Sequence, residues 1–190
     1  MIQPDSTYLQ LVLGHCDLLT ANIILPLEGD TPSHDSDGVT QAKTLKERIR
    51  FIDYEYAVPC PAAFDLANHF AEWGGFECDY NLLPTKAVRR AFIEEYVESY
   101  SRYASLPNTM SSSVVDDLLA DADRYRGIPG LYWGVQALIQ DAISDVDFDW
   151  VSYGAVRLAE YWAWRAEVDN SRINEGKEMP LRERRWALSE

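Results

Sequence analysis

The sequence has few cysteines and no long apolar run, and each shortage excludes a class of protein. Its 190 residues include three cysteines, Cys16, Cys60 and Cys78, with no C-x-x-C pair. This odd number points to reduced thiols in an intracellular, cytoplasmic protein rather than to a disulfide framework. The most apolar early stretch, residues 9–27, contains polar and charged side chains, so neither a membrane span nor membrane insertion is expected. The N-terminal residues lack a basic segment before an apolar run, and no signal peptide is expected.

Basic residues are also scarce in this chain. Seventeen Lys and Arg stand against thirty-one Asp and Glu, which leaves a formal net charge of −14. A field of this sign repels nucleic acid and anionic membrane surfaces, so neither is expected as a partner. The same field favours a cationic substrate and a divalent metal, but an acidic surface that only keeps the protein soluble would carry the same charge.

The apolar content is ordinary and aromatic rings are abundant. Apolar residues make up 47% of the chain and charged residues 25%, which is typical of a soluble globular protein, here one domain or a large piece of one. There are six Trp, eleven Tyr and six Phe, and most of them are expected in the core. Some of the rings could line a pocket for a cationic ligand, because aromatic faces attract ammonium groups.

Short strands followed by helices are predicted along the chain. Strands are predicted at 9–13, 22–25 and 50–52, with a polar surface loop at 28–47 between them. Apolar residues at three- and four-residue spacing predict helices from residue 62 onward and then at 85–103, 111–125, 131–143 and 150–168. The predicted fold class is therefore α+β and mainly helical, with a charged and peripheral C-terminal tail at 169–190.

A histidine, two aspartates and an asparagine form the chemical motif. His15 and Asp17 make an H-x-D, Asn22 follows after four intervening residues, and Asp53 follows the predicted strand at 50–52. Kinase chemistry uses such a set. One carboxylate accepts or orients the proton of the attacking hydroxyl, and the Asn and second Asp hold the magnesium that bridges the phosphates. An isolated H-x-D is common by chance, so the order and the strand context carry the prediction.

The segments around these residues resemble those of a known family. GHCDLLTANII, FIDYEYA and FDLANHFAEWGG are similar to the three hallmark segments of the ethanolamine and choline kinases, and the resemblance runs from about residue 11 to residue 161. That family has a protein-kinase-like fold, uses ATP and magnesium, and phosphorylates the hydroxyl of an amino alcohol. The resemblance implies a kinase-like C-lobe at 1–168, with a few short strands around the catalytic loop, that acts in phospholipid head-group synthesis.

The resemblance also implies roles for individual residues. Asp17 would be the catalytic base, His15 would support its loop, Asn22 and Asp53 would bind magnesium, and Glu55 would support the metal site.

An amino-alcohol pocket follows from the same resemblance. Tyr56, Glu72, Trp133 and Tyr153 fall where the family places its cation-binding acids and aromatics, and a carboxylate with ring faces suits an ammonium group. Taken alone, Trp133 and Tyr153 would be read as helix-packing residues. Three further residues are expected to brace the following helix against the catalytic loop: Asp65, Asn68 and His69.

Two positions depart from the family pattern. Cys16 stands where the family has an Asn between the His and the Asp, and Gln136 stands where choline kinases have a second Trp. An amide in place of an aromatic wall suits a primary ammonium better than a trimethylammonium. Ethanolamine is therefore the predicted substrate, with choline as a further candidate.

A third departure concerns the part of a kinase that clamps the nucleotide. Only fourteen residues precede His15, and they contain no Gly-rich loop and no Lys. We therefore expect the N-lobe to be absent from this chain and the isolated chain to be inactive. Two alternatives stay open: another small-molecule kinase of the aminoglycoside-phosphotransferase type, or a truncated, non-catalytic module that binds an amine or a partner. A homodimer is also left open.

Overall fold

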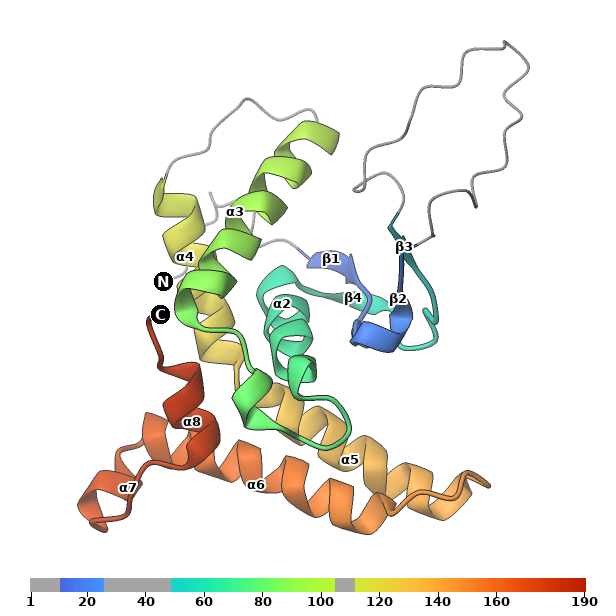
Figure 1. Ribbon diagram of the computed structural model, residues 1–190, viewed down its shortest axis with the longest axis vertical. Coiled ribbons are helices and arrows are strands. Elements are labelled where there is room, and N and C mark those ends of the chain that lie inside the picture. Colours follow the sequence, from blue (N-terminus) through green and yellow to red (C-terminus); the bar gives the residue numbers. More distant parts are fainter. Residues whose placement is uncertain (1–10, 26–48, 105–111) are drawn as a thin grey trace.

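The computed structural model describes residues 11–25, 49–104 and 112–190 (Figure 1). The loop predicted at 28–47 lies outside the described residues. The strands form two small antiparallel pairs, β1 (Leu11–Gly14) with β4 (Val58–Pro61) and β2 (Ile23–Ile24) with β3 (Arg50–Phe51). The remaining elements are helices: η2 (Thr20–Asn22), α2 (Ala62–Ala71), η3 (Glu72–Gly74), η4 (Tyr80–Leu82), α3 (Lys86–Tyr103), α4 (Ser112–Tyr125), α5 (Ile128–Ile143), α6 (Trp150–Val168), α7 (Ser171–Asn174) and α8 (Leu181–Trp186). The predicted α+β, mainly helical class is confirmed.

Most helices begin and end where their apolar spacing predicted. α3 starts after Thr85, whose hydroxyl accepts a hydrogen bond from the Val88 N–H at 3.4 Å and caps the first turn. α6 has the predicted bounds. α5 begins three residues earlier than predicted, because Pro129 is tolerated in a first helical turn, where its missing N–H has no partner to lose. Strand β4 was not predicted, since its two prolines suit only the edge of a sheet.

The main core lies between α2, α3 and α4. Phe70, Ile93 and Leu118, one from each helix, are among the least exposed side chains of the protein. In Figure 1, α3 and α4 lie on one side of α2, and the short strands lie on its other side. This core therefore fixes α2, and α2 supports the loop that carries the predicted chemistry. No helix in the described part of the chain is long and apolar enough to cross a membrane.

Helices α5 and α6 pack side by side along the edge of the molecule (Figure 1). Their close approach depends on small residues. A Cβ added to Gly130 would lie 2.6 Å from the Arg157 carbonyl oxygen, and one added to Gly134 would meet Leu158 at 2.7 Å. The larger apolar residues whose spacing predicted α5 are exposed: Leu131, Val135, Leu138 and Ile139. The spacing therefore identified the helix but not its buried face.

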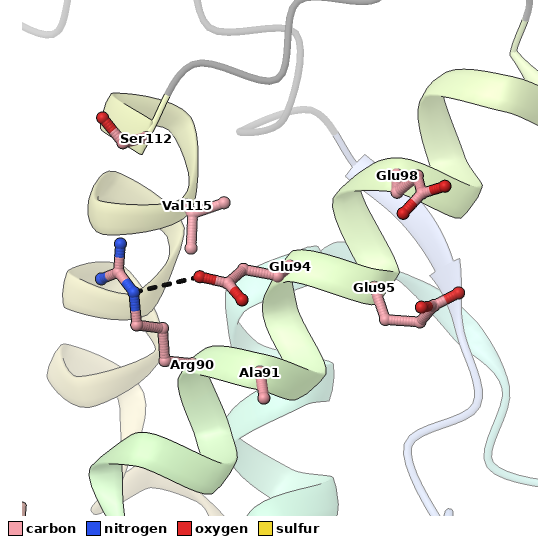
Figure 2. Close-up of a pocket in the computed structure, with 7 residues that line it drawn as sticks. All are labelled: Arg90, Ala91, Glu94, Glu95, Glu98, Ser112 and Val115. Atoms are coloured by element: carbon pink, nitrogen blue, oxygen red, sulfur yellow. Dashed lines mark hydrogen bonds and ion pairs between the residues drawn. The ribbon is translucent and has the colours of Figure 1, made fainter.

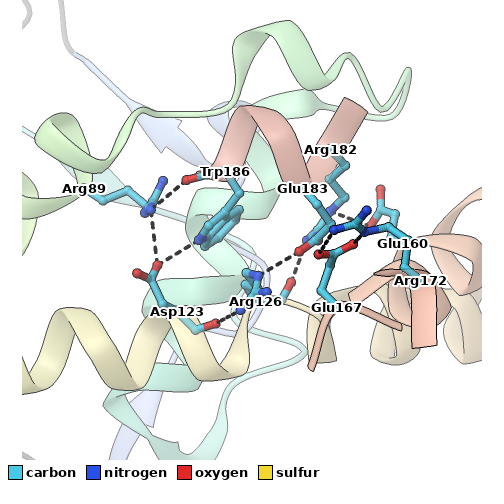
Figure 3. Close-up of polar contacts among 9 residues, drawn as sticks. All are labelled: Arg89, Asp123, Arg126, Glu160, Glu167, Arg172, Arg182, Glu183 and Trp186. Carbon is cyan, nitrogen blue, oxygen red and sulfur yellow. Dashed lines mark hydrogen bonds and ion pairs between the residues drawn. The ribbon is translucent and has the colours of Figure 1, made fainter. Parts of the chain in front are cut away.

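The C-terminal segment is charged, as predicted, but it is not peripheral. Trp186 of α8 is 3% exposed and belongs to the main core. Its ring lies between two guanidinium groups, with Arg89 at 4.5 Å and Arg182 at 5.4 Å, and its indole N–H donates to Asp123 at 2.8 Å (Figure 3). Beyond α8, the Leu188 carbonyl accepts from the first backbone N–H of α3 at 2.8 Å. Two charged residues of this segment, Arg182 and Glu183, are paired inside the protein, which sequence spacing does not reveal.

Trp186→Ala tests the docking of α8. We expect the substitution to lower the free energy of unfolding by about 3–5 kcal/mol, because it leaves a cavity between two cations. Urea unfolding followed by far-UV circular dichroism measures the change. Trp162→Ala is the control, since Trp162 on α6 is 66% exposed, and its effect should stay within about 0.5 kcal/mol. Equal small losses for both variants would show that α8 is not part of the core.

Candidate functional site

One carboxylate of α2 holds the loop that follows β1. Asp65 accepts hydrogen bonds from the backbone N–H of His15 at 3.1 Å and of Cys16 at 2.8 Å. The backbone of Cys16 has a φ of 60°, in the left-handed region that residues other than glycine and asparagine rarely adopt. The two charge-assisted bonds stabilise this backbone conformation. The chain direction that aims the next residue, Asp17, is thus set by Asp65.

Two more residues of α2 bind backbone carbonyls of the same loop. The Asn68 amide donates to the Cys16 carbonyl at 2.8 Å, and the His69 Nδ1 donates to the Leu18 carbonyl at 2.7 Å. The Trp73 indole N–H lies 3.4 Å from His69 Nε2, so that nitrogen accepts and the ring is neutral. Burial lowers the pKa of His69, which agrees with this neutral state. With Asp65, these contacts are the bracing expected from the sequence.

Asp17 and Asn22 contact each other directly. The Asn22 amide nitrogen donates to the Asp17 carbonyl at 2.9 Å and to its carboxylate oxygen Oδ2 at 3.1 Å. Both residues are less than 10% exposed. Because the amide nitrogen is engaged, the atom of Asn22 that can meet a metal ion is the oxygen at the other side of the amide.

His15 joins this loop to the segment after β3. Its Nε2 donates to the Ile52 carbonyl at 2.9 Å, and its ring lies 4.6 Å from the ring of Tyr54. The Ile52 N–H in turn donates to the Asn22 carbonyl at 3.1 Å. Asp53 follows with a φ of 65°, a left-handed conformation that aspartate tolerates better than most residues. Asp17, predicted for catalysis, and Asp53, predicted for metal binding, therefore lie on two segments that hydrogen bonds hold together.

The charge state of Asp17 shows which acids lie near it. Burial, and after it the negative charges of Glu72 and Asp53, raise the pKa of Asp17 to about 6. Three carboxylates from three separate segments therefore act on one region. A buried carboxylate with a pKa near the operating pH is suited to accept a proton from a hydroxyl group.

Asn22 and Asp53 supply hard oxygen donors, which is the chemistry that magnesium prefers. Magnesium in phosphoryl-transfer sites takes one or two protein ligands, and phosphate oxygens and water complete its shell. In the described ranges, no three His, Cys, Asp or Glu side chains gather into a metal-binding group by themselves. The donor set thus fits a magnesium ion that arrives with a nucleotide. Glu55 is exposed beside this segment.

Tyr56, which was predicted for the pocket, and Tyr132, which was not, lie beside Trp133 of α5. The Tyr56 ring lies 5.3 Å from the Trp133 ring in an edge-on arrangement, and Tyr132 lies 5.0 Å from it. The Trp133 indole N–H donates to the Asn68 side chain at 2.9 Å, which ties it to the helix that braces the loop. Gln136, one turn further, hydrogen-bonds the Tyr132 hydroxyl.

Glu72 and Tyr153 form a second group, on the side of α6. Glu72 is 6% exposed and accepts a hydrogen bond from Arg157 at 2.8 Å. The Tyr153 ring lies 5.8 Å from the Arg157 guanidinium, and burial raises the pKa of its hydroxyl. Both groups lie near Asp17. The charge of Glu72 contributes to the raised pKa of Asp17. The pKa of Tyr56 is raised by burial, by the charge of Glu55 and, less strongly, by the charge of Asp17.

Besides Tyr132, two residues of this region were not predicted from the sequence, Gln140 and Arg157. The Gln140 side chain lowers the pKa of the Tyr56 hydroxyl, which burial raises, and Arg157 holds Glu72. Each lies one helical turn after a predicted residue, Gln140 after Gln136 and Arg157 after Tyr153. That spacing places both on the same helical face as the predicted residue and was the available signal.

A pocket of about 460 Å³ lies elsewhere, between α3 and α4 (Figure 2). None of the predicted site residues lines it: its walls are Arg90, Ala91, Glu94, Glu95, Glu98, Ser112 and Val115. Arg90 is already paired with Glu94 at 3.1 Å. The candidate site is therefore defined by the braced loop and its acids, not by this pocket.

Comparison with known proteins identifies the family. A family model described as choline/ethanolamine kinase matches residues 4–162. The chain belongs to the choline/ethanolamine kinase family. Similar proteins include a probable ethanolamine kinase of Nematostella vectensis, 34% identical over 80% of this chain and 39% of that protein, and ethanolamine kinase 1 of Mus musculus, 31% identical over 83% and 39%. A probable choline kinase 1 of Arabidopsis thaliana is 32% identical over 78% of this chain and 38% of its own length.

A solved structure of the choline/ethanolamine kinase family has the same fold. A Plasmodium vivax ethanolamine kinase matches with a TM-score of 0.61 and 32% identity, covering 80% of this chain and 34% of that one. The kinase-like C-lobe predicted from the sequence is confirmed. The chain spans little more than a third of the length of these relatives.

Asp17→Asn tests the electrostatics of the site through stability. Because the folded-state pKa of Asp17, about 6, lies above the ordinary value of 3.8 for aspartate, ionised Asp17 destabilises the fold. We expect the Asn variant to gain about 1–3 kcal/mol in free energy of unfolding above pH 6. The gain should shrink as the pH falls from 6 towards 4. Urea unfolding at pH 5, 6.5 and 8 measures it.

The control for this experiment is Asp117→Asn. Asp117 lies on the exposed face of α4, so its substitution should change stability little at any of these pH values. An Asp17→Asn variant that is no more stable than the parent at pH 8 would show that the ionised carboxylate of Asp17 does not destabilise the fold.

Proposed function

We propose that this chain supplies the catalytic lobe of an ethanolamine kinase. The enzyme transfers the γ-phosphoryl group of ATP, with magnesium, to the hydroxyl of ethanolamine, in cytoplasmic phospholipid head-group synthesis. The observation that carries this proposal is the buried Asp17, held by Asn22 and sharing its surroundings with Asp53 and Glu72. Such a group of acids suits a metal-bound phosphate on one side and an amino alcohol on the other.

The roles follow from the contacts. Asp17 orients the hydroxyl of the substrate and accepts its proton, while Asn22 and Asp53 hold the magnesium bound to the nucleotide. His15 touches neither partner in this scheme and instead joins the two loops. Glu55, exposed beside Asp53, supports the metal site.

The ammonium end of the substrate lies between Glu72 and the aromatic side chains in this proposal. Glu72 supplies the countercharge, and the faces of Tyr56, Trp133 and Tyr153 attract the cation. Gln136 stands where an additional ring would enclose methyl groups, and its amide oxygen can accept from a primary ammonium. Ethanolamine is the preferred substrate for this reason, and choline the weaker one.

A second candidate function has an observation in its favour. Leu11 and Leu13, two residues apart on β1, are 68% and 75% exposed, and Phe51 of the other strand pair is 46% exposed. Neighbouring exposed apolar groups such as the two leucines are typical of a docking surface. A non-catalytic module that binds an amine and pairs with a further lobe or a second copy would also use such a surface. A kinase of the aminoglycoside-phosphotransferase type gains no comparable support.

Turnover by a lobe-complete protein tests the kinase proposal. We expect the chain joined to the N-terminal lobe of an ethanolamine kinase relative to consume ATP with ethanolamine and magnesium. Asp17→Asn should lower kcat by about a hundredfold or more, because the group that orients the nucleophile is lost. The 190 residues alone should give no useful rate, since phosphoryl transfer depends on groups that clamp the phosphates.

Asp117→Asn on the exposed face of α4 serves as the control and should leave the rate unchanged. Turnover by Asp17→Asn within a few-fold of the parent would refute the role of Asp17. A lobe-complete protein that folds and binds ethanolamine without turnover would favour the binding module.

Gln136→Trp tests the choice of amine. The added ring should strengthen attraction to a methylated cation by about 0.5–2 kcal/mol and shift relative kcat/KM towards choline. Competition assays with the lobe-complete protein measure the ratio of the two products. Gln136→Leu, which is apolar without an aromatic face, should not produce the shift. A parent protein whose kcat/KM for choline equals or exceeds that for ethanolamine would contradict the assigned preference.

A further inference from the structure

A line of buried charges connects Glu72 with the C-terminal helix α8. Arg157 donates to Glu72 at 2.8 Å, and its Nε lies 3.4 Å from a carboxylate oxygen of Glu160. The same oxygen of Glu160 lies 3.5 Å from Arg182, and Arg182 pairs with Glu183 at 2.9 Å. The side chains of these five residues are between 1% and 7% exposed. Figure 3 shows the part of the line that joins α6 to α8.

Stability alone is a weak reason for such a line. Removing charges from water is costly, and apolar side chains of similar volume often stabilise a core as well as a buried ion pair does. Buried ionised groups are, however, common where a protein controls the charge of a functional residue. The line ends at Glu72, an acid that also acts on Asp17. Its position thus connects it with the candidate site.

We propose that Arg157 is a positioning residue for Glu72, and that α8 holds Arg157 in place through Arg182 and Glu160. The inference rests on the proposed function, in which Glu72 receives the substrate ammonium. Arg157 binds the Oε1 oxygen of Glu72, which directs Oε2 to the incoming cation. The residues from 169 onward thereby become part of the amine site, although none of them touches the substrate.

The backbone of Arg157 is fixed as firmly as its side chain. Its carbonyl oxygen faces Gly130 of α5 so closely that a Cβ at this glycine would lie 2.6 Å away. Tyr153 lies one turn before Arg157 on α6, and its ring is 5.8 Å from the Arg157 guanidinium. A guanidinium with several fixed neighbours loses little freedom when it binds a carboxylate, which suits it to set the orientation of that group.

The surroundings of Glu72 explain why it needs this partner. Burial raises the pKa of Glu72, and the charge and hydrogen bond of Arg157 act against this rise. Without Arg157 the pKa of Glu72 would rise further, which would weaken the attraction of this carboxyl for an ammonium group. The groups that face Glu72 come from several elements: Arg157, Glu160 and Tyr153 from α6, Arg182 from α8, Cys78 from the turn after η3, and Asp17 from the catalytic loop.

Carboxyl NMR and amine binding on the 190-residue chain test this inference. The ¹³C carboxyl signal of Glu72, assigned by its absence in Glu72→Gln, gives the titration midpoint of this group. Arg157→Lys keeps the charge but loses the planar fork, so we expect the midpoint to rise by about one pH unit and ethanolamine binding to weaken about tenfold. In the Glu72→Gln background, Arg157→Lys should no longer affect binding, because its effect passes through Glu72.

Two further variants keep the test decisive. Arg172→Lys is the matched control, since Arg172 pairs with Glu167 away from Glu72 and should move neither readout. Arg182→Lys on α8 should shift both readouts in the same direction as Arg157→Lys but by less, and it replaces that variant if Arg157→Lys fails to fold.

Each outcome separates this inference from the proposed function. An unchanged Glu72 midpoint in Arg157→Lys and Arg182→Lys overturns the inference, as does equal weakening of ethanolamine binding with and without Glu72. A parent chain that binds no ethanolamine, but whose Glu72 midpoint still follows Arg157, overturns the proposed amine site and leaves the positioning role supported.

Discussion

The candidate site depends on the contact between the Asp65 carboxylate and two backbone N–H groups of the loop after β1. Holding Cys16 in the left-handed region costs on the order of 1–3 kcal/mol. Each hydrogen bond to a charged acceptor contributes about 1.5–3 kcal/mol, so the two bonds to Asp65 offset that cost. Without them the loop would relax, and Asp17 would leave the position where Asn22 meets it.

Helix α2 turns this one contact into a rigid arrangement. Asp65, Asn68 and His69 lie on successive positions of the same helical face, and each binds backbone atoms of the loop. Glu72 follows directly after the helix ends. The acid proposed for the amine and the loop proposed for the phosphoryl transfer therefore share one support. Because the core packs against the opposite side of α2, the stability of that core determines how accurately the two are spaced.

Among the described residues, most buried charged groups are paired with opposite charges, but Asp17 at the candidate site is not. The buried cations are paired with acids, as in the line from Glu72 to α8. The pKa of Asp17 is instead raised, first by burial and then by the negative charges of Glu72 and Asp53. Such a strained group weakens the fold in order to serve a site, a compromise that is common where activity requires it. The metal ion and the cationic amine of the proposed function would both relieve the repulsion among these acids.

The sequence alone determined the local elements and the chemical motif. The Thr85 cap and the spacing of apolar residues defined α3 and α6, because these signals lie within a few residues of one another. The order of His15, Asp17, Asn22 and Asp53 along the chain indicated a kinase. Only the tertiary structure decided which faces are buried. Small residues of α5 pack against α6, Trp186 enters the core, and Arg157 reaches Glu72 across 85 positions of the chain. Such contacts join residues far apart in sequence, and no local pattern records which partner each side chain will meet.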